Sequence, residues 1–553
     1  MQNVRRQSRD NIELLTETSW EVCNKIGGIY TVLSTKARVL QEKYGDKLVF
    51  IGPDVWTEAN PSPYFVERKT VLNGCASKLS LPYGITIRTG RWNVPGSPQV
   101  ILVKFDGVYS HLNDIFGKMW ELYGVNSMNA YGDYHEGCAF AVASAIVMQA
   151  LSAFLKVKPT GLTAHFNEWT TAMGLLYLKM IQPESSTLFT THATSIGRSI
   201  CGNGKPLYDY FTGYNGDQMA GELNMEAKHS LEKTAAHQAD CFTAVSEITA
   251  RECEQLLDIR PQVVTPNGFE PDFVPGTGKY ASLRNAARKR ILEIAGALKG
   301  KTYPSDTLIV ATSGRNEYRN KGLDLFLDSL VRLEEKTHKE ILALILVPAW
   351  VKEPSAELNA ALANKTTVKD APDFLTHRLN NEGYDSVSCR ISSLESEGKL
   401  KNKVNVVYVP CYLDGKDGIV DISYYDFLPA LDLTVFASYY EPWGYTPLES
   451  IAFGVPTITS DKSGFGQWIL SNFVNSLSAC GVKVVGRSDS NYGEAAEEIA
   501  NQIARYSVET AKEKGEARGA ATATSVKADW KFFIKAYDEA FRVAARRRDA
   551  RLK

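Results

Sequence analysis

Apolar runs alternate with helical periodicity along the chain, and this pattern predicts parallel β-sheets. Near the N-terminus the extended segment ELLTETSW leads through a glycine turn into a helix with Ile29, Val32 and Leu40 on one side, and LVFIGP follows as a strand. A strand, a helix and a strand in this order form a βαβ unit, which implies parallel strands with right-handed crossovers. Further strands are predicted at 187–191, 241–246, 262–265, 307–313, 341–347, 404–409, 433–438 and 455–460. Since most of them precede a helical pattern, we assign the chain to the α/β class.

A cluster of prolines and glycines separates these strands into two groups. The segment PNGFEPDFVPGTGKY is the strongest break in the chain, and a chain of this length exceeds a single core. We predict two doubly wound halves whose strands line a crevice with their carboxyl ends, where open α/β sheets bind ligands. The predicted domains are 1–268 and 269–510. A helical segment, 511–553, follows and packs back on the first domain.

Composition and charge exclude several classes of protein. The formal net charge is -1, with 44% apolar and 23% charged residues, so no overall field attracts nucleic acid or anionic lipid. Nine cysteines without a CxxC pair favour a reducing compartment. The basic start lacks the apolar core of an export signal, and we interpret 139–155 as a buried helix rather than a membrane span. We therefore predict a cytoplasmic protein without a nucleic-acid or membrane partner.

Reactive side chains follow strands of both predicted halves. His192 follows 187–191, and Asn267 follows 262–265. Arg315 and Lys321 follow 307–313, and Glu441 follows 433–438. Each could be structural by itself, but five residues at strand ends predict a shared site.

The segment SGRNEYRNKG predicts a clamp for a leaving diphosphate. Arg315 and Lys321 are cations that need no proton transfer, and they suit a charge that grows in the transition state. The alternative for Arg315 is a surface ion pair with Glu317.

The glycine turn after the first strand is a weaker signal for phosphate binding. Lys25, Gly27 and Gly28 could bring a cation and bare backbone amides to a phosphate at a helix start. The spacing matches neither a dinucleotide fingerprint nor a P-loop, so a purely structural turn is an equal alternative.

The segment SYYEPWGYTPLES carries the most specific pattern. Glu441 lies in a strand-to-helix loop and Glu449 in the following helix, whose start offers the amides of Gly444, Tyr445 and Thr446. One acid would meet the sugar and the other the ribose hydroxyls, while the alternative is a capping and packing segment. No HExxH motif or DxD motif accompanies them. We therefore predict a mechanism without metal or cofactor, in which cations and helix ends stabilise the leaving group.

Long blocks of the chain resemble the animal and fungal type of glycogen synthase. They are WEVCNKIGGIYTVL, AHFNEW, FTTHATSIGR, TAAHQADCFTAVSEIT, VTPNG, SGRNEYRNKG and SYYEPWGYTPLES, and the match covers roughly residues 14 to 480. The resemblance implies a GT-B fold of two Rossmann-like domains, with the acceptor on the N-terminal and the donor on the C-terminal side. It also implies retaining transfer of glucose from UDP-glucose to the non-reducing end of an α-1,4-glucan such as glycogen, by a homo-oligomer, a tetramer.

The resemblance also assigns roles to matching residues. Catalytic roles fall on Glu441, Arg315, Lys321 and His192. Donor binding falls on Lys25, Gly27, Gly28, Arg198, Asn267, Tyr424, Trp443, Gly444, Tyr445, Thr446 and Glu449, with Glu168 as a supporting residue. No metal ligands are implied.

The chain departs from the family pattern at two places in these blocks. Asn167 replaces a histidine in AHFNEW, a change from which we expect little effect if Glu168 and Trp169 stay in place. The stretch 411–421 is unfamiliar, so the aromatic side chain that stacks on uracil is assigned to Tyr424, with Tyr412 as the alternative.

The sequence motifs by themselves leave alternative functions open. A phosphorylase would share the architecture but carries pyridoxal phosphate motifs that we do not find. A catalytically inactive glycan-binding or nucleotide-sugar-binding protein should lack Glu441, Arg315 or Lys321, and ADP-glucose is the alternative donor. In the family, glucose 6-phosphate binds an arginine-rich helix before the segment matched here by ADWKFF. Residues 505–527 carry few arginines, so we predict insensitivity to this effector.

Overall fold

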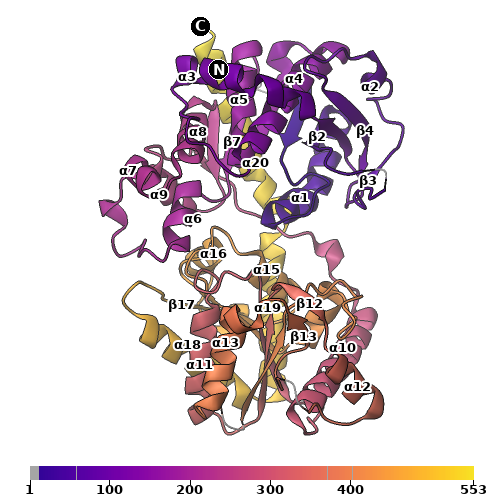
Figure 1. The fold of residues 1–553 in the computed structure, drawn as a ribbon, viewed down its shortest axis with the longest axis vertical. Helices are drawn as coiled ribbons and strands as arrows, with labels where there is room; N and C mark the ends of the chain where they lie inside the picture. Colours follow the sequence, from indigo (N-terminus) through magenta and orange to yellow (C-terminus); the bar gives the residue numbers. More distant parts are fainter. Residues whose placement is uncertain (1–11, 58, 370–371, 401–402) are drawn as a thin grey trace, which may run out of the picture. The chain divides into compact units, whose positions relative to one another are not determined.

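The computed structural model describes residues 12–57, 59–369, 372–400 and 403–553. The chain divides into two compact units, with a boundary between Glu270 and Pro271 (Figure 1). Unit 1 holds the chain up to Glu270 together with Trp530–Lys553, and unit 2 holds Pro271–Asp529. The basic start of the chain, on which the expectation of no export signal rests, falls on residues 1–11 and lies outside the described residues.

Unit 1 contains a mixed sheet in which β4 pairs antiparallel with β3 and β5 and all other described strand pairs are parallel. In spatial order its described strands are β3 (Phe65–Val66), β4 (Thr86–Trp92), β5 (Gln99–Lys104), β2 (Leu48–Pro53), β1 (Leu14–Thr18), β6 (Leu162–Asn167), β7 (Ser186–Thr191), β8 (Cys241–Ala244) and β9 (Val263–Val264). The central strands β1, β2, β6 and β7 are buried along their whole length. Such strands need cover on both faces, which the helices provide.

The helices of unit 1 include one that is membrane-like in composition. The described helices are α1 (Gly28–Tyr44), α2 (Cys75–Lys78), α3 (Leu112–Tyr123), α4 (Tyr134–Phe154), α5 (Trp169–Ile181), α6 (Ser195–Gly202), α7 (Gly216–Glu222), α8 (Glu226–Gln238), α9 (Glu247–Leu256) and α20 (Trp530–Arg551). By length and composition α4 could cross a membrane, but 78% of its apolar window is buried inside unit 1. The helix packs against α5, as a core helix does.

Unit 2 contains a sheet whose described strands are all parallel. In spatial order they are β14 (Val404–Val409), β11 (Ile341–Leu346), β10 (Leu308–Ser313), β15 (Leu433–Phe436), β16 (Thr457–Ser460) and β17 (Val482–Val485). A separate antiparallel pair consists of β12 (Val351–Pro354) and β13 (His377–Leu379). The described helices are α10 (Thr277–Lys299), α11 (Leu323–Lys336), α12 (Ala356–Asn364), α13 (Ser386–Ser396), α14 (Tyr424–Phe427), α15 (Tyr445–Ala452), α16 (Gly464–Asn472), α17 (Leu477–Cys480), α18 (Tyr492–Val508) and α19 (Ala511–Ser525).

Each sheet reverses its winding once. In unit 1 the chain moves from β1 to β2 and β5 on one side, whereas β6, β7, β8 and β9 continue on the other. In unit 2, β10 leads to β11 and β14 on one side, and β15 leads to β16 and β17 on the other. Loops leave the two central strand ends toward opposite faces at such a reversal, and ligands bind there in open α/β sheets. The reversal points are therefore β1/β6 and β10/β15.

The C-terminal segment belongs to both units, which corrects the expectation that 511–553 forms one piece. Helix α19 packs against α15 and α17 of unit 2, because its small Ala521 fits closely over Gly481. Only α20 returns to unit 1, where it contacts α1, β7 and β8 (yellow in Figure 1). Trp530 at its start is buried and donates a hydrogen bond from Nε1 to Thr35 Oγ1 at 2.8 Å.

Candidate functional site

The loop after β10 lies against the end of β15. Gly322 has a φ of +70°, and a Cβ atom there would lie 2.1 Å from the carbonyl oxygen of Ala437, so this position requires glycine. The backbone N–H groups of Tyr439 and Tyr440 donate to the carbonyl oxygen of Asn320 at 2.8 and 3.2 Å. These contacts bring the SGRNEYRNKG loop and the SYYEPWGYTPLES loop together at the reversal point of unit 2.

Two of the predicted catalytic residues meet at this point. Lys321 Nζ forms an ion pair and hydrogen bond with Glu441 Oε2, although the residues are 120 positions apart. The side chains are only 14% and 15% exposed. Ser438 Oγ donates to the same carboxylate oxygen at 3.5 Å. Partial burial strengthens the attraction between the two charges relative to a surface pair, so the pair fixes the geometry of both side chains.

Arg315 adopts the alternative arrangement that the sequence left open. Its guanidinium pairs with Glu317 Oε1 at 2.9 Å, and the side chain is 50% exposed. Such a pair is weak and its members are easily separated. Arg315 is therefore close in sequence to Lys321 but is not part of the Lys321–Glu441 pair.

A buried arginine that sequence reasoning missed holds the two loops in place. Arg487 follows β17 and is 3% exposed. Its guanidinium donates to the carbonyl oxygens of Ala437 and Arg319, the latter at 3.5 Å, and lies 3.7 Å from Asp324 Oδ1. These partners come from the end of β15, the Lys321 loop and α11. A cation directly after the apolar strand VKVV is a signal that the sequence does contain.

The second acid of the motif lies in α15 beside aromatic residues. Glu449 is buried, and its Oε1 accepts a hydrogen bond from Tyr425 OH at 2.8 Å. Tyr424 OH and Ser313 Oγ lie 2.9 Å apart at the end of β10. Burial and the nearby Glu449 carboxylate raise the pKa of both tyrosines, so both phenols stay neutral hydrogen-bond donors. Tyr425 is a further residue that the sequence analysis did not assign.

The remaining residues of this loop differ in exposure. Gly444 has a φ of +106° and precedes α15, which starts at Tyr445 and includes Thr446. Trp443 is buried and packs edge-on against Phe465 at 6.4 Å between ring centroids. Tyr412, the alternative candidate for base stacking, is 74% exposed after β14. An exposed ring offers a free stacking face, whereas Tyr424 is held by Ser313.

In unit 1 the start of α1 differs from the expectation of bare amides. Glu21 Oε2 accepts hydrogen bonds from the backbone N–H groups of Gly27 and Tyr30 at 2.7 and 2.9 Å. A carboxylate at a helix start satisfies orphan N–H groups and interacts favourably with the helix dipole. Lys25 is exposed, with Nζ 5.7 Å from the centre of the Tyr30 ring. The glycine turn is therefore already capped by the protein itself, and an incoming phosphate would compete with Glu21.

His192 follows β7 and connects to the reversal point between β1 and β6. His192 Nε2 lies 3.1 Å from Asn167 Oδ1, and Asn167 Nδ2 contacts Glu17 Oε2 at 3.3 Å. Glu17 in turn pairs with Lys36 of α1 at 3.1 Å, with both side chains fully buried. Asn167, which differs from the family pattern, thus joins a predicted catalytic residue to a buried ion pair.

Glu168 stands in an unusual backbone conformation beside a second acid. Its φ and ψ are 72° and 163°, a region populated almost only by glycine, and such strain clusters at functional sites. Burial and the neighbouring Glu232 carboxylate raise the pKa of Glu168 to about 8, against the lowering effect of Arg198. Arg198 lies on the exposed side of α6. Glu168 therefore carries a proton for much of its time at neutral pH.

Asn267 follows β9 in unit 1. It is 3% exposed, and its Oδ1 has no hydrogen-bond partner among the described residues. A buried unsatisfied amide costs free energy unless a ligand or water completes it.

One group among the described residues has the composition of a metal site. His377, Cys411 and Asp417 bring potential ligand atoms within 4.8 Å of one another. However, His377 Nδ1 lies 2.8 Å from Thr376 Oγ1, and Nε2 lies 2.9 Å from the carbonyl oxygen of Asp417. The Asp417 carboxylate accepts three backbone N–H groups of its own loop. These contacts brace the loop after β14 and occupy the His377 and Asp417 atoms that a metal would need.

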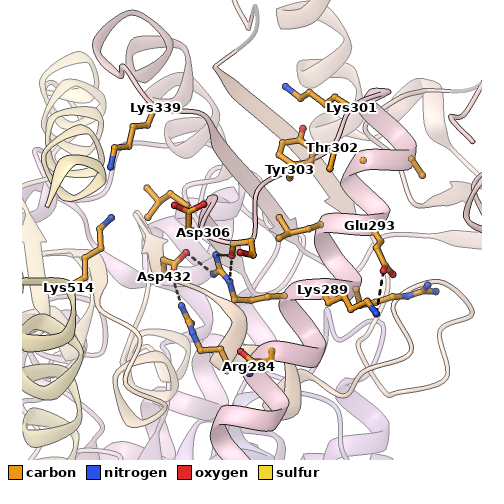
Figure 2. Close-up of a pocket in the computed structure, with 18 of the residues that line it drawn as sticks. Arg284, Lys289, Glu293, Lys301, Thr302, Tyr303, Asp306, Lys339, Asp432 and Lys514 are labelled. Atoms are coloured by element: carbon orange, nitrogen blue, oxygen red, sulfur yellow. Dashed lines mark hydrogen bonds and ion pairs between the residues drawn. The ribbon is translucent and has the colours of Figure 1, made fainter. Parts of the chain in front are cut away.

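A cavity of unit 2 lies away from the reversal point. It has a volume of about 1580 Å³ and is lined by residues of α10, α19 and the segments beside them (Figure 2). Asp432 lies between two guanidinium groups there, with Arg284 NH2 at 2.7 Å and Arg288 NH1 at 2.8 Å. Burial raises the pKa of Asp432, but Arg288 and Arg284 outweigh burial and hold it below its ordinary value.

The arginines of this cavity are also engaged by backbone carbonyl groups. Arg288 donates to the carbonyl oxygens of Ser305, Thr307 and Ala430. Arg518 of α19 donates to Leu431 O at 3.0 Å and to Tyr280 OH at 2.5 Å. These guanidinium groups fasten α10 and α19 to the segment before β15, so they do not form an open cluster for a phosphate.

Comparison with known proteins identifies relatives over nearly the whole chain. A family model described as glycogen synthase matches residues 17–370 and 358–550. A glycogen [starch] synthase of Neurospora crassa is 28% identical over 97% of this chain and 84% of its own length. That of Dictyostelium discoideum is 29% identical over 99% and 68%, and the human liver protein is 28% identical over 95% and 82%.

Solved structures share the fold at low sequence identity. The catalytic domain of starch synthase IV from Arabidopsis thaliana, bound to ADP and acarbose, has a TM-score of 0.59 and 15% identity, covering 97% of this chain and 99% of its own. An α,α-trehalose 6-phosphate synthase from Burkholderia multivorans has a TM-score of 0.54 and 11% identity, covering 98% and 99%. These likenesses confirm the expected GT-B fold.

The position of Arg487 predicts a loss of turnover when its guanidinium is removed. We expect Arg487→Met to lower kcat by about 10- to 100-fold with little change in KM, because displacing the Lys321 loop by a fraction of an ångström misaligns the reacting groups. Arg332→Met on the partly exposed side of α11 is the matched control and should retain the wild-type rate. Steady-state kinetics on variants with wild-type circular dichroism test this, and an unchanged kcat in Arg487→Met would contradict it.

The engaged arginines of the cavity sharpen the prediction about glucose 6-phosphate. Since Arg284, Arg288 and Arg518 already bind Asp432 and carbonyl oxygens, we expect millimolar glucose 6-phosphate to leave the rate of glucose transfer unchanged. The measurement is initial rate against donor concentration with and without the effector, with potassium sulfate at equal ionic strength as the control. A several-fold activation specific to glucose 6-phosphate would show that the cavity opens to a phosphate.

Proposed function

Because the chain belongs to the glycogen synthase family, whose function is glucose transfer to a glucan, we propose that it transfers glucose from UDP-glucose to the non-reducing end of an α-1,4-glucan with retention of configuration. The observation that carries this proposal is the partly buried Lys321–Glu441 pair at the reversal point of unit 2. A cation and a carboxylate at this point suit a nucleotide sugar, since one faces the leaving diphosphate and the other the positive charge that grows on the sugar.

In the proposed reaction the bond between the anomeric carbon and the diphosphate oxygen breaks, and the acceptor hydroxyl attacks from the same face. The leaving diphosphate takes the proton of that hydroxyl, so charge and protons balance without an external base. Lys321 stabilises the diphosphate as its charge grows, and Arg315 joins it by exchanging Glu317 for phosphate oxygens. The Arg315–Glu317 pair is half-exposed, so breaking it costs little.

The donor is held by hydrogen bonds as well as charge. Glu449 accepts from the ribose hydroxyls, and its bond to Tyr425 OH keeps the carboxylate oriented. Backbone N–H groups at the start of α15, from Trp443 to Thr446, bind phosphate oxygens. Tyr424 or the exposed Tyr412 stacks on the base.

Residues of unit 1 receive their proposed roles from the family resemblance alone. By their match to the family motifs, His192 contacts the transferred glucose, Arg198 and Lys25 approach the phosphates, and Glu168 and Asn267 support them.

We also propose that the reaction needs no metal ion, and that the protein is cytoplasmic and forms a homo-oligomer. ADP-glucose is the alternative donor, since no described contact fixes the base.

A donor comparison tests the proposed function. Purified protein is incubated with glycogen and radiolabelled UDP-glucose or ADP-glucose, with excess EDTA in parallel. We expect label in the polymer, a higher kcat/KM for UDP-glucose and no loss of rate in EDTA, because cationic side chains replace the metal. No incorporation from either donor would contradict the function. Loss of rate that magnesium restores would contradict metal independence alone.

Substitutions at the reacting groups test the roles of Glu441 and Arg315. We expect Glu441→Ala and Arg315→Ala each to lower kcat by on the order of 100-fold or more while the fold stays intact, since removing one group that stabilises transition-state charge has this effect. Glu397→Ala and Arg260→Ala change exposed ion pairs elsewhere and serve as controls. Near-normal turnover in either test variant would refute its assignment.

A further inference from the structure

We propose that Asn167 is a positioning residue for His192. A buried network orients its amide so that Oδ1 accepts the Nε2–H of His192, which leaves His192 Nδ1 as a hydrogen-bond acceptor for a hydroxyl group of the transferred sugar. The identity of the hydroxyl-bearing ligand rests on the proposed function. The tautomer of His192 rests only on contacts within unit 1.

The network begins with an ion pair at the reversal point between β1 and β6. Lys36 Nζ lies 3.1 and 3.2 Å from the two carboxylate oxygens of Glu17, and both side chains are 0% exposed. Tyr537 of α20 covers the pair, with its ring centre 4.1 Å from Lys36 Nζ. Burial alone would raise the pKa of Glu17, but His165 and Lys36 together lower it to about 2. Glu17 is therefore a fixed carboxylate, which can only accept hydrogen bonds.

This fixed charge determines which end of the Asn167 amide faces which neighbour. Asn167 Nδ2 lies 3.3 Å from Glu17 Oε2 and 3.2 Å from the carbonyl oxygen of Thr18. Both neighbours are acceptors without a proton to give, so the atom that meets them must be the amide nitrogen with its two hydrogens. A flipped amide would place its oxygen against two other oxygens. The Oδ1 atom must then point to His192.

The amide orientation in turn determines the tautomer of His192. Its Nε2 lies 3.1 Å from Asn167 Oδ1, and because an amide oxygen only accepts, Nε2 must carry the hydrogen. Burial, followed by the charge of Lys36, lowers the pKa of His192 to about 3. The imidazole is therefore neutral at physiological pH, and its Nδ1 holds a lone pair rather than a second hydrogen. Nδ1 has no hydrogen-bond partner among the described residues.

A neighbouring histidine, His165, shows that the same network selects opposite tautomers for its two imidazole rings. His165 Nδ1 lies 2.9 Å from the Glu17 carboxylate and must donate to it, so His165 Nε2 accepts from Thr190 Oγ1 at 2.7 Å. His165 is thus the Nδ1–H tautomer and is satisfied within the protein. His192 is the Nε2–H tautomer and keeps an acceptor atom for a ligand. Asn167 produces this difference because it interposes an amide between the carboxylate and the second ring.

Nitrogen NMR of histidine-labelled protein tests the tautomer without reference to activity. Long-range ¹⁵N–¹H correlation distinguishes a protonated from an unprotonated ring nitrogen, and the His192 signals are assigned by their loss in His192→Gln. We expect wild-type His192 to be the Nε2–H tautomer. Asn167→Leu should shift it to a mixture or to the Nδ1–H form, whereas isosteric Asn167→Asp, which keeps an acceptor, should retain Nε2–H.

The controls keep this experiment decisive. Asn203→Leu, on the exposed end of α6, should leave the His192 signals unchanged. If Asn167→Leu does not fold, Asn167→Ala removes the same acceptor with less steric change. A wild-type Nδ1–H tautomer, or an unchanged Nε2–H tautomer in every folded variant that lacks the acceptor, would overturn the proposal.

Kinetics with deoxy donors test the link to the sugar. We expect Asn167→Leu to lower kcat/KM for UDP-glucose by about 10- to 100-fold. With one of the 2-, 3-, 4- or 6-deoxyglucose donors the loss in kcat/KM should be much smaller, because that donor lacks the hydroxyl that Nδ1 binds. The losses in Asn167→Leu and His192→Gln should not add in the double variant.

Two outcomes separate the two proposals. Equal loss with all four deoxy donors, or additive losses in the double variant, would refute the positioning role while leaving glucose transfer intact. A wild-type protein that is inactive with every donor would refute the proposed function, and the NMR result would still decide the tautomer.

Discussion

The candidate site residues of each unit depend on one constraint of parallel sheets, the reversal of winding at a single pair of strands. Right-handed crossovers carry the chain outward from the centre in each direction, so only the two central strand ends are free of a covering connection. In unit 2 these are the ends of β10 and β15, and they carry Lys321 and Glu441. In unit 1 they are the ends of β1 and β6, and they carry Glu17 and Asn167. Charged and amide groups can be held there because neighbouring side chains and backbone carbonyl groups pair with them.

Apolar strands and the residues at their ends could be predicted from sequence because their signals are local. The strand at 307–313 and the one at 433–438 are β-rich runs, and the structure has β10 and β15 within those ranges. Strand β6 was missed, although it lies at the centre of its sheet, because Thr163, His165 and Asn167 interrupt its apolar residues. His165 and Asn167 are buried for a reason that no local pattern reveals, since their partners lie on β1 and β7.

The ion pairs also show that a local sequence pattern does not reveal partners that are distant in the chain. The Arg315–Glu317 pair joins residues two positions apart and was an explicit alternative from the sequence. Lys321 pairs instead with Glu441, and Arg487 binds carbonyl oxygens of Arg319 and Ala437, which come together only after the sheet has formed. The turn at Gly27 and Gly28 predicts an anion at the helix start, but the carboxylate of Glu21 already accepts from the N–H groups of Gly27 and Tyr30. A helix start attracts any anion, and the sequence does not tell which anion arrives.

The two units use buried charge for orientation rather than for net stability. A buried ion pair gains little over a well-packed apolar pair, because desolvation offsets the attraction. Glu17 and Arg487 instead fix the orientation of their neighbours. The Glu17 carboxylate determines which atom of the Asn167 amide faces it, and the Arg487 guanidinium determines where two backbone segments lie. Apolar packing could fill the same space but could not distinguish an amide oxygen from an amide nitrogen. Reactive groups that must present one particular atom to a ligand therefore require charged supports behind them, even where those supports cost stability.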